Sequence, residues 1–307
     1  MTDMLDFLRN EGINDSIITD IEAFRREYPA SDEQTARVPR PKYMYYGASV
    51  WQRALAAVLA GENLLLVGPK ATGKNVLAEN LSAVFGRPQW DISFYLNTDA
   101  ASLIGADTFK NGEVSFRRGP IYRCADEGGF GVLDEINMAK NESLSVLHAT
   151  LDFRRIIDVP GYERIRLSPC TRFIATMNYG YAGTREINEA LASRFMVINM
   201  PIISADNLKK LMLAQFPALK DEYAGQLAAL FEELRRKCDS SEISTKALDL
   251  RGLLAAVSLT RQGLTLDEAL EMGIVNKSFD DFERQLVSDV IAARIPTGLD
   301  ETSLFTK

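Results

Sequence analysis

The chain has 307 residues, of which 46% are hydrophobic and 25% charged, as in ordinary globular proteins. Its net charge of −7 argues against a surface that coats nucleic acid, although a local basic patch would not show in the total. No apolar run approaches the roughly 18 residues needed to span a membrane, and the amino terminus has no apolar core of the signal-peptide kind. The three cysteines are widely spaced and predict neither a disulfide framework nor a zinc site. These features predict a cytoplasmic protein of one large or two modest domains that does not enter a membrane.

The first 44 residues are predicted to form a helical extension and a linker. Residues 1–28 favour two short helices broken at Gly12, with Asn14 or Asp15 as the cap of the second. Residues 29–42 are polar and contain three prolines, a composition typical of a linker. The pattern of this segment assigns no function to it.

An alternation of helical and strand-like segments follows, which predicts an α/β domain over residues 45–203. A helix should begin at Ser49, where Ser-Val-Trp-Gln matches a capping box, and end before Gly61. Five short apolar runs have the length of buried strands, and their alternation with helices predicts a parallel sheet covered on both faces. Beyond Pro201 only amphipathic helical patterns follow, which predicts a smaller helical domain over residues 204–307. The strand-like runs are 64–67, 90–94, 130–133, 173–177 and 196–200.

A glycine-rich loop connects the first of these runs to a helical pattern. Residues 68–75 read Gly-Pro-Lys-Ala-Thr-Gly-Lys-Asn, a spacing typical of phosphate-binding loops between a strand and a helix. Glycines let successive backbone N–H groups point at a phosphate chain, the helix adds its positive amino end, and Lys74 would reach the outer phosphates. An ordinary glycine turn is the alternative interpretation. The predicted nucleotide-binding residues of the loop are Gly68, Pro69, Lys70, Ala71, Thr72, Gly73, Lys74, Asn75 and Val76.

The residue after this lysine departs from the usual chemistry. Position 75 ordinarily carries Ser or Thr, whose hydroxyl coordinates Mg²⁺, whereas this chain has Asn75. The amide oxygen of Asn75 is also a hard ligand, but its side chain is one atom longer. The loop therefore predicts nucleotide binding, with Asn75 as a metal ligand, and leaves the efficiency of hydrolysis open.

Two carboxylates follow the strand-like run at residues 130–133. A strand at this place would put Asp134 and Glu135 at the carboxyl edge of the sheet, where open α/β folds bind ligands. We expect Asp134 to hold Mg²⁺ through water and Glu135 to polarise the attacking water, since phosphoryl transfer needs mainly positioning and charge stabilisation. An acidic pair that merely starts a helix is the alternative, which the phosphate loop upstream disfavours.

Asp-Glu-Ile-Asn-Met-Ala at residues 134–139 resembles the second nucleotide motif of AAA+ ATPases, in particular the dynein-related, MoxR and CbbQ/NorQ groups. Residues 174–178 resemble the fourth strand of that family, and residues 183–195 resemble the segment that carries its arginine finger. The resemblance implies a P-loop AAA+ parallel-sheet core flanked by helices, followed by a smaller all-helical lid domain. It also implies Mg²⁺-dependent hydrolysis of ATP. The catalytic residues that it implies are Lys74, Glu135, Asn178 and Arg194.

The matched positions give several residues a role by resemblance. Asn178 matches the sensor that orients water against the terminal phosphate, and Arg194 matches the finger that reaches the ATP of the neighbouring subunit. Residues 249–254 resemble the second-sensor helix, which makes Arg251 a contact to the phosphates. From the residues alone, Asn178 also suits a turn cap and Arg194 a surface charge. Lys246 competes with Arg251 for the second-sensor role.

Two further segments resemble insertions of the same clade. Residues 103–105 and 112–120 resemble an insertion in its second helix, and residues 155–168 resemble its hairpin before the sensor strand. For Arg117 and Arg118, an ordinary exposed pair is favoured over a place in a ring pore.

Other positions depart from the pattern or stay ambiguous. Phe153 stands where relatives usually carry a charged residue, so the hairpin base is expected to pack differently. Leu250 stands where the CbbQ-type pattern has Thr, which affects the local helix cap. Arg185 is either a second cation for the neighbouring subunit or a solvated side chain.

An arginine finger stabilises charge at the ATP of a neighbouring subunit, so a chain with one such module should form a ring. The resemblance implies that the ring is a hexamer. The leading hypothesis is a MoxR/CbbQ-like ATPase that remodels or activates a partner protein. The resemblance suggests a partner with a von Willebrand A domain. One alternative is a nucleic-acid-directed motor of the restriction-system type, which the acidic composition disfavours. Another is a nucleotide-gated assembly module that hydrolyses ATP slowly or not at all, which Asn75 favours.

Overall fold

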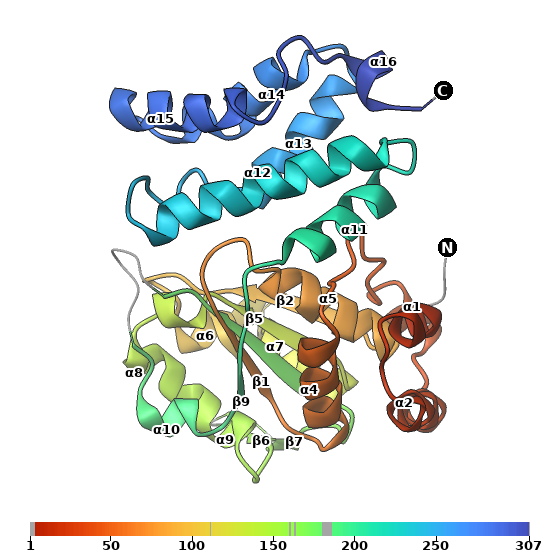
Figure 1. Cartoon of the computed structure of the whole chain (residues 1–307). Helices are drawn as coiled ribbons and strands as arrows, with labels where there is room; N and C mark the ends of the chain where they lie inside the picture. Colours follow the sequence, from red (N-terminus) through yellow and green to blue (C-terminus); the bar gives the residue numbers. More distant parts are fainter. Residues whose placement is uncertain (1–3, 111, 160, 163, 180–185, 307) are drawn as a thin grey trace. The chain divides into compact units, whose positions relative to one another are not determined.

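Two compact units make up the chain, Met1–Pro201 and Ile202–Lys307 (Figure 1). The computed structural model describes residues 4–110, 112–159, 161–162, 164–179 and 186–306. The first unit contains a parallel sheet with helices on its faces, and the second unit is built of helices. The predicted α/β fold class, with a helical region after the sheet, is therefore confirmed.

The sheet of the first unit has the strand order β2-β5-β8-β1-β9, and every neighbouring pair is parallel. Each of the five predicted apolar runs forms one of these strands, to within one residue at either end. The three central runs could be located because a strand buried on both faces lacks polar alternation, whereas the edge strands β2 and β9 are partly exposed. The strands are β1 (Leu64–Val67), β2 (Gln89–Ser93), β5 (Phe130–Asp134), β8 (Arg172–Met177) and β9 (Met196–Asn199).

Alternate residues of β1 show how the two faces of the sheet are covered, because successive side chains of a strand point to opposite faces. Leu64 and Leu66 lie in one buried cluster together with helices α4 and α5. Leu65 and Val67 lie in a second buried cluster together with helix α7. The expected burial of both faces is thus confirmed. The three helices are α4 (Ala48–Leu59), α5 (Lys74–Val84) and α7 (Pro120–Glu127).

The register of the central strands brings their carboxyl ends to one edge of the sheet. Val67 of β1 pairs with Met177 of β8, and Leu133 of β5 pairs with Ala175 of β8. The segments that leave these three strands are therefore neighbours, at the edge where open α/β sheets bind ligands. They begin with Gly68, Glu135 and Asn178.

The polypeptide begins with helices α1 (Met4–Asn10) and α2 (Asp15–Glu27), which are broken at Gly12 as the sequence predicts. Of the two expected caps of α2, Asn14 occupies the N-cap position, but its side chain makes no cap hydrogen bond. The predicted linker contains a further short helix, α3 (Asp32–Thr35), whose capping box joins Ser31 and Gln34.

The start of α4 also differs from the prediction. The helix begins at Ala48, and Gly47 precedes it with φ 153°, so Ser49 lies inside the first turn. The Ser49 hydroxyl accepts a hydrogen bond from Arg53 instead of capping the helix. The predicted capping box is therefore wrong, whereas the end of the helix before Gly61 is confirmed.

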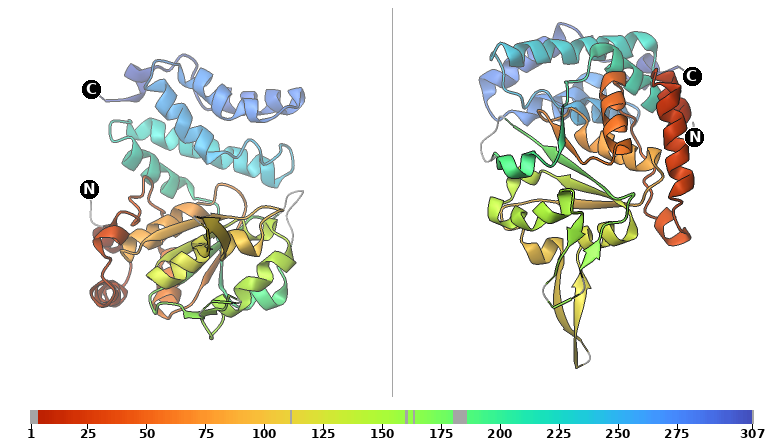
Figure 2. Two further views of the ribbon diagram at one scale, coloured as in Figure 1. Left: turned by 180° about the vertical axis from the view of Figure 1, so that it is seen from behind. Right: turned by 90° about the horizontal axis from the view of Figure 1, so that it is seen from below.

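Two antiparallel hairpins interrupt the α/β alternation, and both lie in the segments that resemble clade insertions. The hairpin of β3 and β4 extends away from the sheet (Figure 2). The shorter hairpin of β6 and β7 precedes β8. The Tyr162 hydroxyl donates to Asp107 Oδ1 across 2.5 Å, and the Tyr162 ring packs against Phe116, so the hairpins contact each other. The strands are β3 (Gly105–Lys110), β4 (Glu113–Arg118), β6 (Ile156–Ile157) and β7 (Ile165–Arg166).

Short helical segments complete the described part of the first unit. One of them follows β5 directly, and several others lie between β5 and the β6–β7 hairpin. They are α6 (Ala100–Leu103), η1 (Ile136–Met138), α8 (Asn141–Leu144), η2 (Ser145–Leu147), α9 (His148–Leu151) and α10 (Glu189–Ala192).

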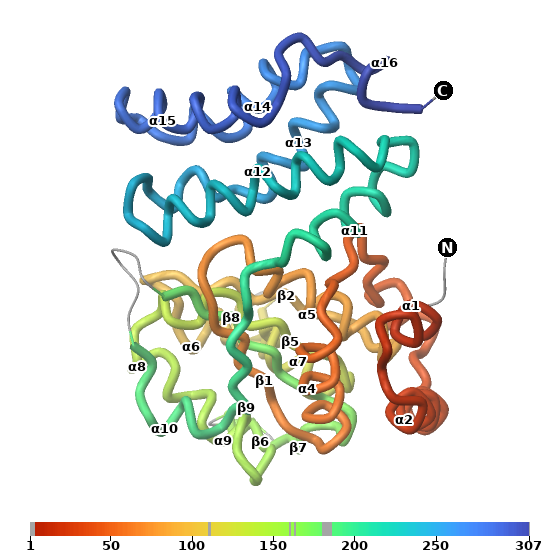
Figure 3. Tube along the Cα trace, in the orientation of Figure 1, coloured from red at the N-terminus to blue at the C-terminus, as the bar shows by residue number. Residues whose placement is uncertain are grey.

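The second unit is a set of packed helices (Figure 3). Helices α13 and α14 pack with their backbones in contact, since a Cβ on Gly252 would lie 1.9 Å from the carbonyl oxygen of Gly273. No helix within the described ranges combines the length and the apolar character that crossing a bilayer requires. The elements are α11 (Ala205–Gln215), α12 (Asp221–Asp239), α13 (Leu250–Thr260), α14 (Leu266–Gly273), η3 (Val275–Lys277), α15 (Asp281–Ala292) and α16 (Glu301–Leu304).

Candidate nucleotide site

The glycine-rich loop joins β1 to α5 in a tightly curled conformation. Ala71 has φ 62° and Gly73 has φ 79°, both in the left-handed region, and Lys74 is the first residue of α5. Gly68 is packed so closely that a Cβ there would lie 2.9 Å from the carbonyl oxygen of Met200. Left-handed residues curl a loop so that its N–H groups turn inward, and a helix amino end adds partial positive charge. This backbone suits an anionic ligand such as a phosphate chain.

The Lys74 side chain is folded into this loop and is only 7% exposed. Its Nζ donates to the carbonyl oxygens of Gly68 (2.9 Å) and Pro69 (2.7 Å) and lies 3.3 Å from Thr72 Oγ1. Burial lowers the pKa of Lys74 to about 8, although the nearby carboxylates of Asp134 and Glu135 act to raise it. A buried ammonium surrounded by neutral oxygens lacks a full counter-charge, so the position is suited to a negatively charged ligand.

The residues proposed to hold Mg²⁺ lie on two different elements. Asn75 is exposed in the first turn of α5, and Asp134 ends β5. Among the described residues, no group of three or more His, Cys, Asp or Glu side chains is placed to hold a metal alone. Mg²⁺ in nucleotide sites uses one or two protein oxygens, with phosphates and waters supplying the rest. A donor set of one carboxylate and one amide oxygen fits that chemistry.

Thr176 connects the two carboxylates to the neighbouring strand. Its hydroxyl donates to Asp134 Oδ1 across 2.6 Å and accepts from the backbone N–H of Glu135 at 3.0 Å. The side-chain amide of Asn178 donates to Glu135 Oε1 across 2.8 Å. Asn137 in turn donates from Nδ2 to the carbonyl oxygen of Asn178 across 2.8 Å. The ends of β5 and β8 are thus joined by one hydrogen-bond network.

Glu135 occupies a strained backbone conformation within this network. Its φ is 54°, in the left-handed region that residues with a Cβ rarely adopt. Such strain persists only where surrounding contacts fix it, and it concentrates at functional sites. Thr176 of β8 and Asn178 just after it hold Glu135. The backbone N–H of Met138 also donates to the Glu135 carbonyl oxygen across 2.8 Å.

Sequence reasoning missed Thr176 and Asn137, although a signal for the first was present. Thr176 interrupts the apolar run of β8 and is 1% exposed. A buried hydroxyl in an apolar strand requires a hydrogen-bond partner, which the structure supplies from the end of the adjacent strand β5. Asn137 offered no such signal, because its partner depends on the turn that follows β5.

Arg194 lies apart from the phosphate loop of its own chain. It precedes β9, which runs parallel and in register with β1, so it is near the amino end of a strand pair whose carboxyl end carries the loop. Its guanidinium donates to the carbonyl oxygens of His148 (3.1 Å) and Ala190 and lies 3.6 Å from Asp152 Oδ2. Arg194 therefore lies near the edge of the sheet formed by the amino ends of β1 and β9, whereas the phosphate loop follows the carboxyl end of β1.

Arg251 belongs to the second unit, where it is exposed in the first turn of α13. The helix cap beside Leu250 is supplied by Asp249, whose Oδ1 accepts from the Arg251 backbone N–H across 3.0 Å. The competing Lys246 places its ammonium 5.8 Å from the centre of the Phe279 ring. The phosphate contact of Arg251 stays a prediction, and Arg185 lies outside the described residues.

The other residues singled out from the sequence lie on the surface. Arg118 forms an ion pair with Asp126 at 2.9 Å and stacks over the Tyr122 ring, while Arg117 is exposed. Phe153 is 92% exposed, so it does not pack at the base of the short hairpin.

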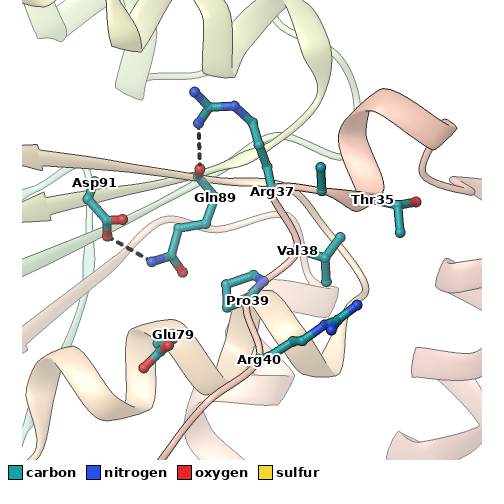
Figure 4. Close-up of a pocket in the computed structure, with 9 residues that line it drawn as sticks. Thr35, Arg37, Val38, Pro39, Arg40, Glu79, Gln89 and Asp91 are labelled. Carbon is teal, nitrogen blue, oxygen red and sulfur yellow. Dashed lines mark hydrogen bonds between the residues drawn. The ribbon is translucent and has the colours of Figure 1, made fainter.

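A hollow of about 420 Å³ lies beside the edge strand β2 (Figure 4), and no residue of the phosphate loop lines it. Its lining combines residues 35–40 of the predicted linker with Glu79, Gln89 and Asp91. Arg37 donates to the carbonyl oxygen of Gln89 across 3.2 Å, and Gln89 Nε2 donates to Asp91 Oδ1 across 2.7 Å. These contacts tie the linker to the sheet edge.

Comparison with known proteins agrees with this geometry. The family described as AAA domain (dynein-related subfamily) matches residues 63–195, which include the loop, the acidic pair, Asn178 and Arg194. The chain is 34% identical over 271 residues to Uncharacterized protein YojN of Bacillus subtilis (strain 168), covering 86% of this chain and 88% of the relative. It is 34% identical over 256 residues to Uncharacterized protein SH1500 of Staphylococcus haemolyticus (strain JCSC1435), covering 81% and 97%. It is also 34% identical over 255 residues to Uncharacterized protein SAB1265c of Staphylococcus aureus (strain bovine RF122 / ET3-1), again covering 81% and 97%. The names of these relatives assign no activity.

Proposed function

Since this chain belongs to the dynein-related subfamily of AAA-domain proteins, we propose that it is a Mg²⁺-dependent ATPase whose subunits form a ring and act on a partner protein. The observation that carries the proposal is the convergence at one sheet edge of a buried lysine in a phosphate loop with the hydrogen-bonded pair of Glu135 and Asn178. These are the groups that phosphoryl transfer to water requires: a cation for the phosphates and a fixed carboxylate for the water.

Each residue of this edge has a distinct role in the proposed reaction. Lys74 binds the outer phosphate oxygens and neutralises their charge as the terminal phosphoryl group leaves. Glu135 orients the attacking water and accepts its proton, and Asn178 holds the carboxylate and faces the terminal phosphate. Mg²⁺, held by Asn75 and Asp134, would supply further positive charge against the phosphates.

The position of Arg194 supports a site shared between two subunits. A strand of four residues spans roughly 13 Å, so a residue before β9 is separated from the loop after β1 by at least the length of that strand. An arginine that stabilises transferred phosphoryl charge must contact the phosphates. Arg194 therefore serves the nucleotide of a neighbouring copy, and head-to-tail contacts of this kind close into a ring. Family resemblance favours six subunits.

The partner is proposed by resemblance, as a protein that carries a von Willebrand A domain. In the MoxR and CbbQ groups, which the sequence resembles, the partner protein often carries such a domain. In this proposal, ATP hydrolysis at the shared sites changes the contact between neighbouring subunits, and the partner responds to that change.

A second candidate is a nucleotide-gated assembly module that holds ATP and turns it over slowly. The exposed Asn75 favours it, because the side chain replaces the shorter hydroxyl that usually binds Mg²⁺ at this position. In that case the ring would close on ATP binding and remain closed.

Steady-state phosphate release separates the two candidates. The parent chain and an Asn75→Thr variant are compared with ATP and Mg²⁺, and a Lys74→Ala variant corrects for contaminating ATPases. Turnover by the parent that is lost on chelating the metal would support the remodelling ATPase. Turnover that appears only in Asn75→Thr would support the assembly module. Absence of turnover and of ATP binding in both would overturn the proposed function.

A further inference from the structure

The helix that carries the phosphate loop is held at its carboxyl end by the N-terminal helix pair. Arg25 of α2 donates from Nε to the carbonyl oxygen of Val84 across 2.7 Å and from Nη2 to that of Ala83 at 3.4 Å. Carbonyls in the last turn of a helix lack intrahelical partners, and a cation at this end also interacts favourably with the helix dipole. Leu8 and Ile21 are fully buried in the cluster that α5 shares. The pair α1–α2 is thus packed on α5 rather than appended to the unit.

A turn at residues 43–47 covers the opposite end of α5. The Tyr45 ring lies against the loop backbone, since a Cβ on Gly73 would be 3.0 Å from the ring atom Cδ2. Asn80, from the middle of α5, ties the turn to the helix. Its Oδ1 accepts from the Tyr45 N–H across 2.8 Å, and its Nδ2 donates to the Tyr43 carbonyl oxygen across 2.9 Å. The turn and the phosphate loop are therefore in direct contact.

The N-terminal helices reach this turn as well. Glu11, which follows α1, accepts from the Gly47 N–H at Oε2 across 3.0 Å. The Phe7 ring packs edge-on against Tyr46, with 5.4 Å between ring centres. A carboxylate that accepts from a backbone N–H forms a charge-assisted bond, and Gly47 is the cap residue of α4, whose amino end favours negative charge.

We infer that the N-terminal helix pair is a support of the phosphate loop, and that Glu11 is a positioning residue for nucleotide binding. The contacts run from Glu11 to Gly47, through the adjoining Tyr45 ring, to Gly73. Gly73 must keep its left-handed φ of 79° for the loop to stay curled. The Tyr45 ring restricts the other backbone conformations of Gly73. Without the Glu11 contact, a smaller fraction of the molecules has the loop in its binding conformation. The apparent nucleotide affinity then falls in proportion to that fraction. This inference rests on the nucleotide binding in the proposed function.

The test measures the dissociation constant of a fluorescent ADP analogue for the full chain and a set of variants. Glu11→Ala should raise it about three- to tenfold, as expected if the competent fraction falls to roughly a third to a tenth. Glu11→Gln keeps a side-chain oxygen for the Gly47 N–H and should stay within about twofold of the parent. Asp6→Ala is the matched control, because it removes an exposed carboxylate from α1 that pairs only with Arg9 among the ion pairs of the described residues. Its affinity should be that of the parent.

Thermal unfolding without nucleotide separates positioning from a general loss of stability. Arg25→Gln loosens the end of α5 that is far from the loop, so it should lower the unfolding temperature while changing nucleotide affinity less than Glu11→Ala does. Phe7→Leu weakens the contact to Tyr46 without emptying the core, and should raise the dissociation constant as Glu11→Ala does, even where Glu11→Ala folds poorly.

Two results would overturn the inference while the proposed function stands. One is parental affinity in both Glu11→Ala and Phe7→Leu. The other is a rise in the dissociation constant that tracks the loss of unfolding temperature equally in Arg25→Gln and Glu11→Ala. A parent chain that binds no nucleotide would overturn the proposed function itself, and the inference with it.

Discussion

Asn178 donates a hydrogen bond from Nδ2 to Glu135 Oε1 across 2.8 Å, which joins the carboxyl ends of β8 and β5. The two residues to which family resemblance gives the water-orienting roles therefore form one pair. Glu135 is held in addition through its backbone N–H by Thr176. A change of Asn178 or Thr176 should change the orientation of the carboxylate, and a change of Glu135 removes it, which gives the site several independent tests.

Glu135→Gln should stop hydrolysis while leaving ATP binding intact. The amide oxygen of glutamine still accepts from Asn178, so the pair is preserved, but an amide cannot accept the proton of the attacking water. General-base catalysis contributes about 10²- to 10⁴-fold, so phosphate release should fall by at least roughly 10²-fold. Assembled rings should accumulate with ATP, measured by sedimentation. Phosphate release at the parental rate would show that Glu135 does not activate the water.

Thr176→Val tests the hydroxyl that joins Asp134 to Glu135. Valine has nearly the same shape but leaves both hydrogen bonds unmade, which should destabilise the fold by about 1–3 kcal/mol and lower phosphate release. Thr176→Ser keeps the hydroxyl and should restore most of the turnover while leaving a small cavity. Denaturant unfolding and phosphate release are measured on both variants. Equal turnover in parent and valine variant would limit Thr176 to a structural role.

The strands of the sheet could be predicted because the burial of a strand is reflected in its own short stretch of sequence. The central strands are buried on both faces, which leaves their sequences almost without polar residues, and β1 (Leu64–Val67) is apolar and buried throughout. The phosphate loop was equally visible, since Gly68 and Gly73 stand where close packing or a left-handed φ requires glycine.

The helix starts and the supporting contacts could not be predicted in the same way. Ser49 has the residue type of a cap, but Gly47 precedes the helix and its N–H bonds to Glu11, which is distant in sequence. Likewise, the sequence pattern around Arg194 says nothing of Asp152, because the pair depends on how two loops pack. Such contacts are set by tertiary structure, where local propensity has little influence.

Nucleotide affinity should fall as pH rises above about 8. Burial lowers the pKa of Lys74 from 10.5 to about 8, so the unfolded chain holds this proton more tightly than the folded chain does. Stability therefore rises with pH between about 8 and 10.5, as the cost of the buried charge is relieved. Phosphates favour the charged form, so binding above pH 8 takes up a proton and should weaken by up to about tenfold per pH unit.

This pH dependence is measured with a fluorescent ADP analogue and no added metal, between about pH 7.5 and 10. Lys74→Arg is the control, because a guanidinium keeps its charge over the whole range. If the arginine variant binds the ADP analogue, its affinity should not fall with pH, because no proton is lost at position 74. A parent whose affinity is as flat as that of the arginine variant would contradict the lowered pKa of Lys74.

Arg194→Ala should abolish hydrolysis with little loss of nucleotide affinity, because the side chain lies away from its own phosphate loop. Arginine fingers supplied by a neighbour are worth about 10³- to 10⁵-fold in turnover, so phosphate release should fall by roughly 10³-fold or more. Lys74→Ala should also be inactive, since it loses the cation proposed to bind the phosphates. Each variant is measured alone before mixing.

Mixing the two inactive variants then tests whether the site is shared. In a mixed ring, an Arg194→Ala subunit still has Lys74, and a neighbouring Lys74→Ala subunit still has Arg194, so an interface between them contains both groups. Phosphate release should therefore reappear on mixing and follow the proportion of the two proteins. A double variant that lacks both residues is the control and should restore nothing when mixed with Lys74→Ala. If the Arg194→Ala and Lys74→Ala mixture stays inactive although sedimentation shows mixed rings, Arg194 acts within its own chain or not at all.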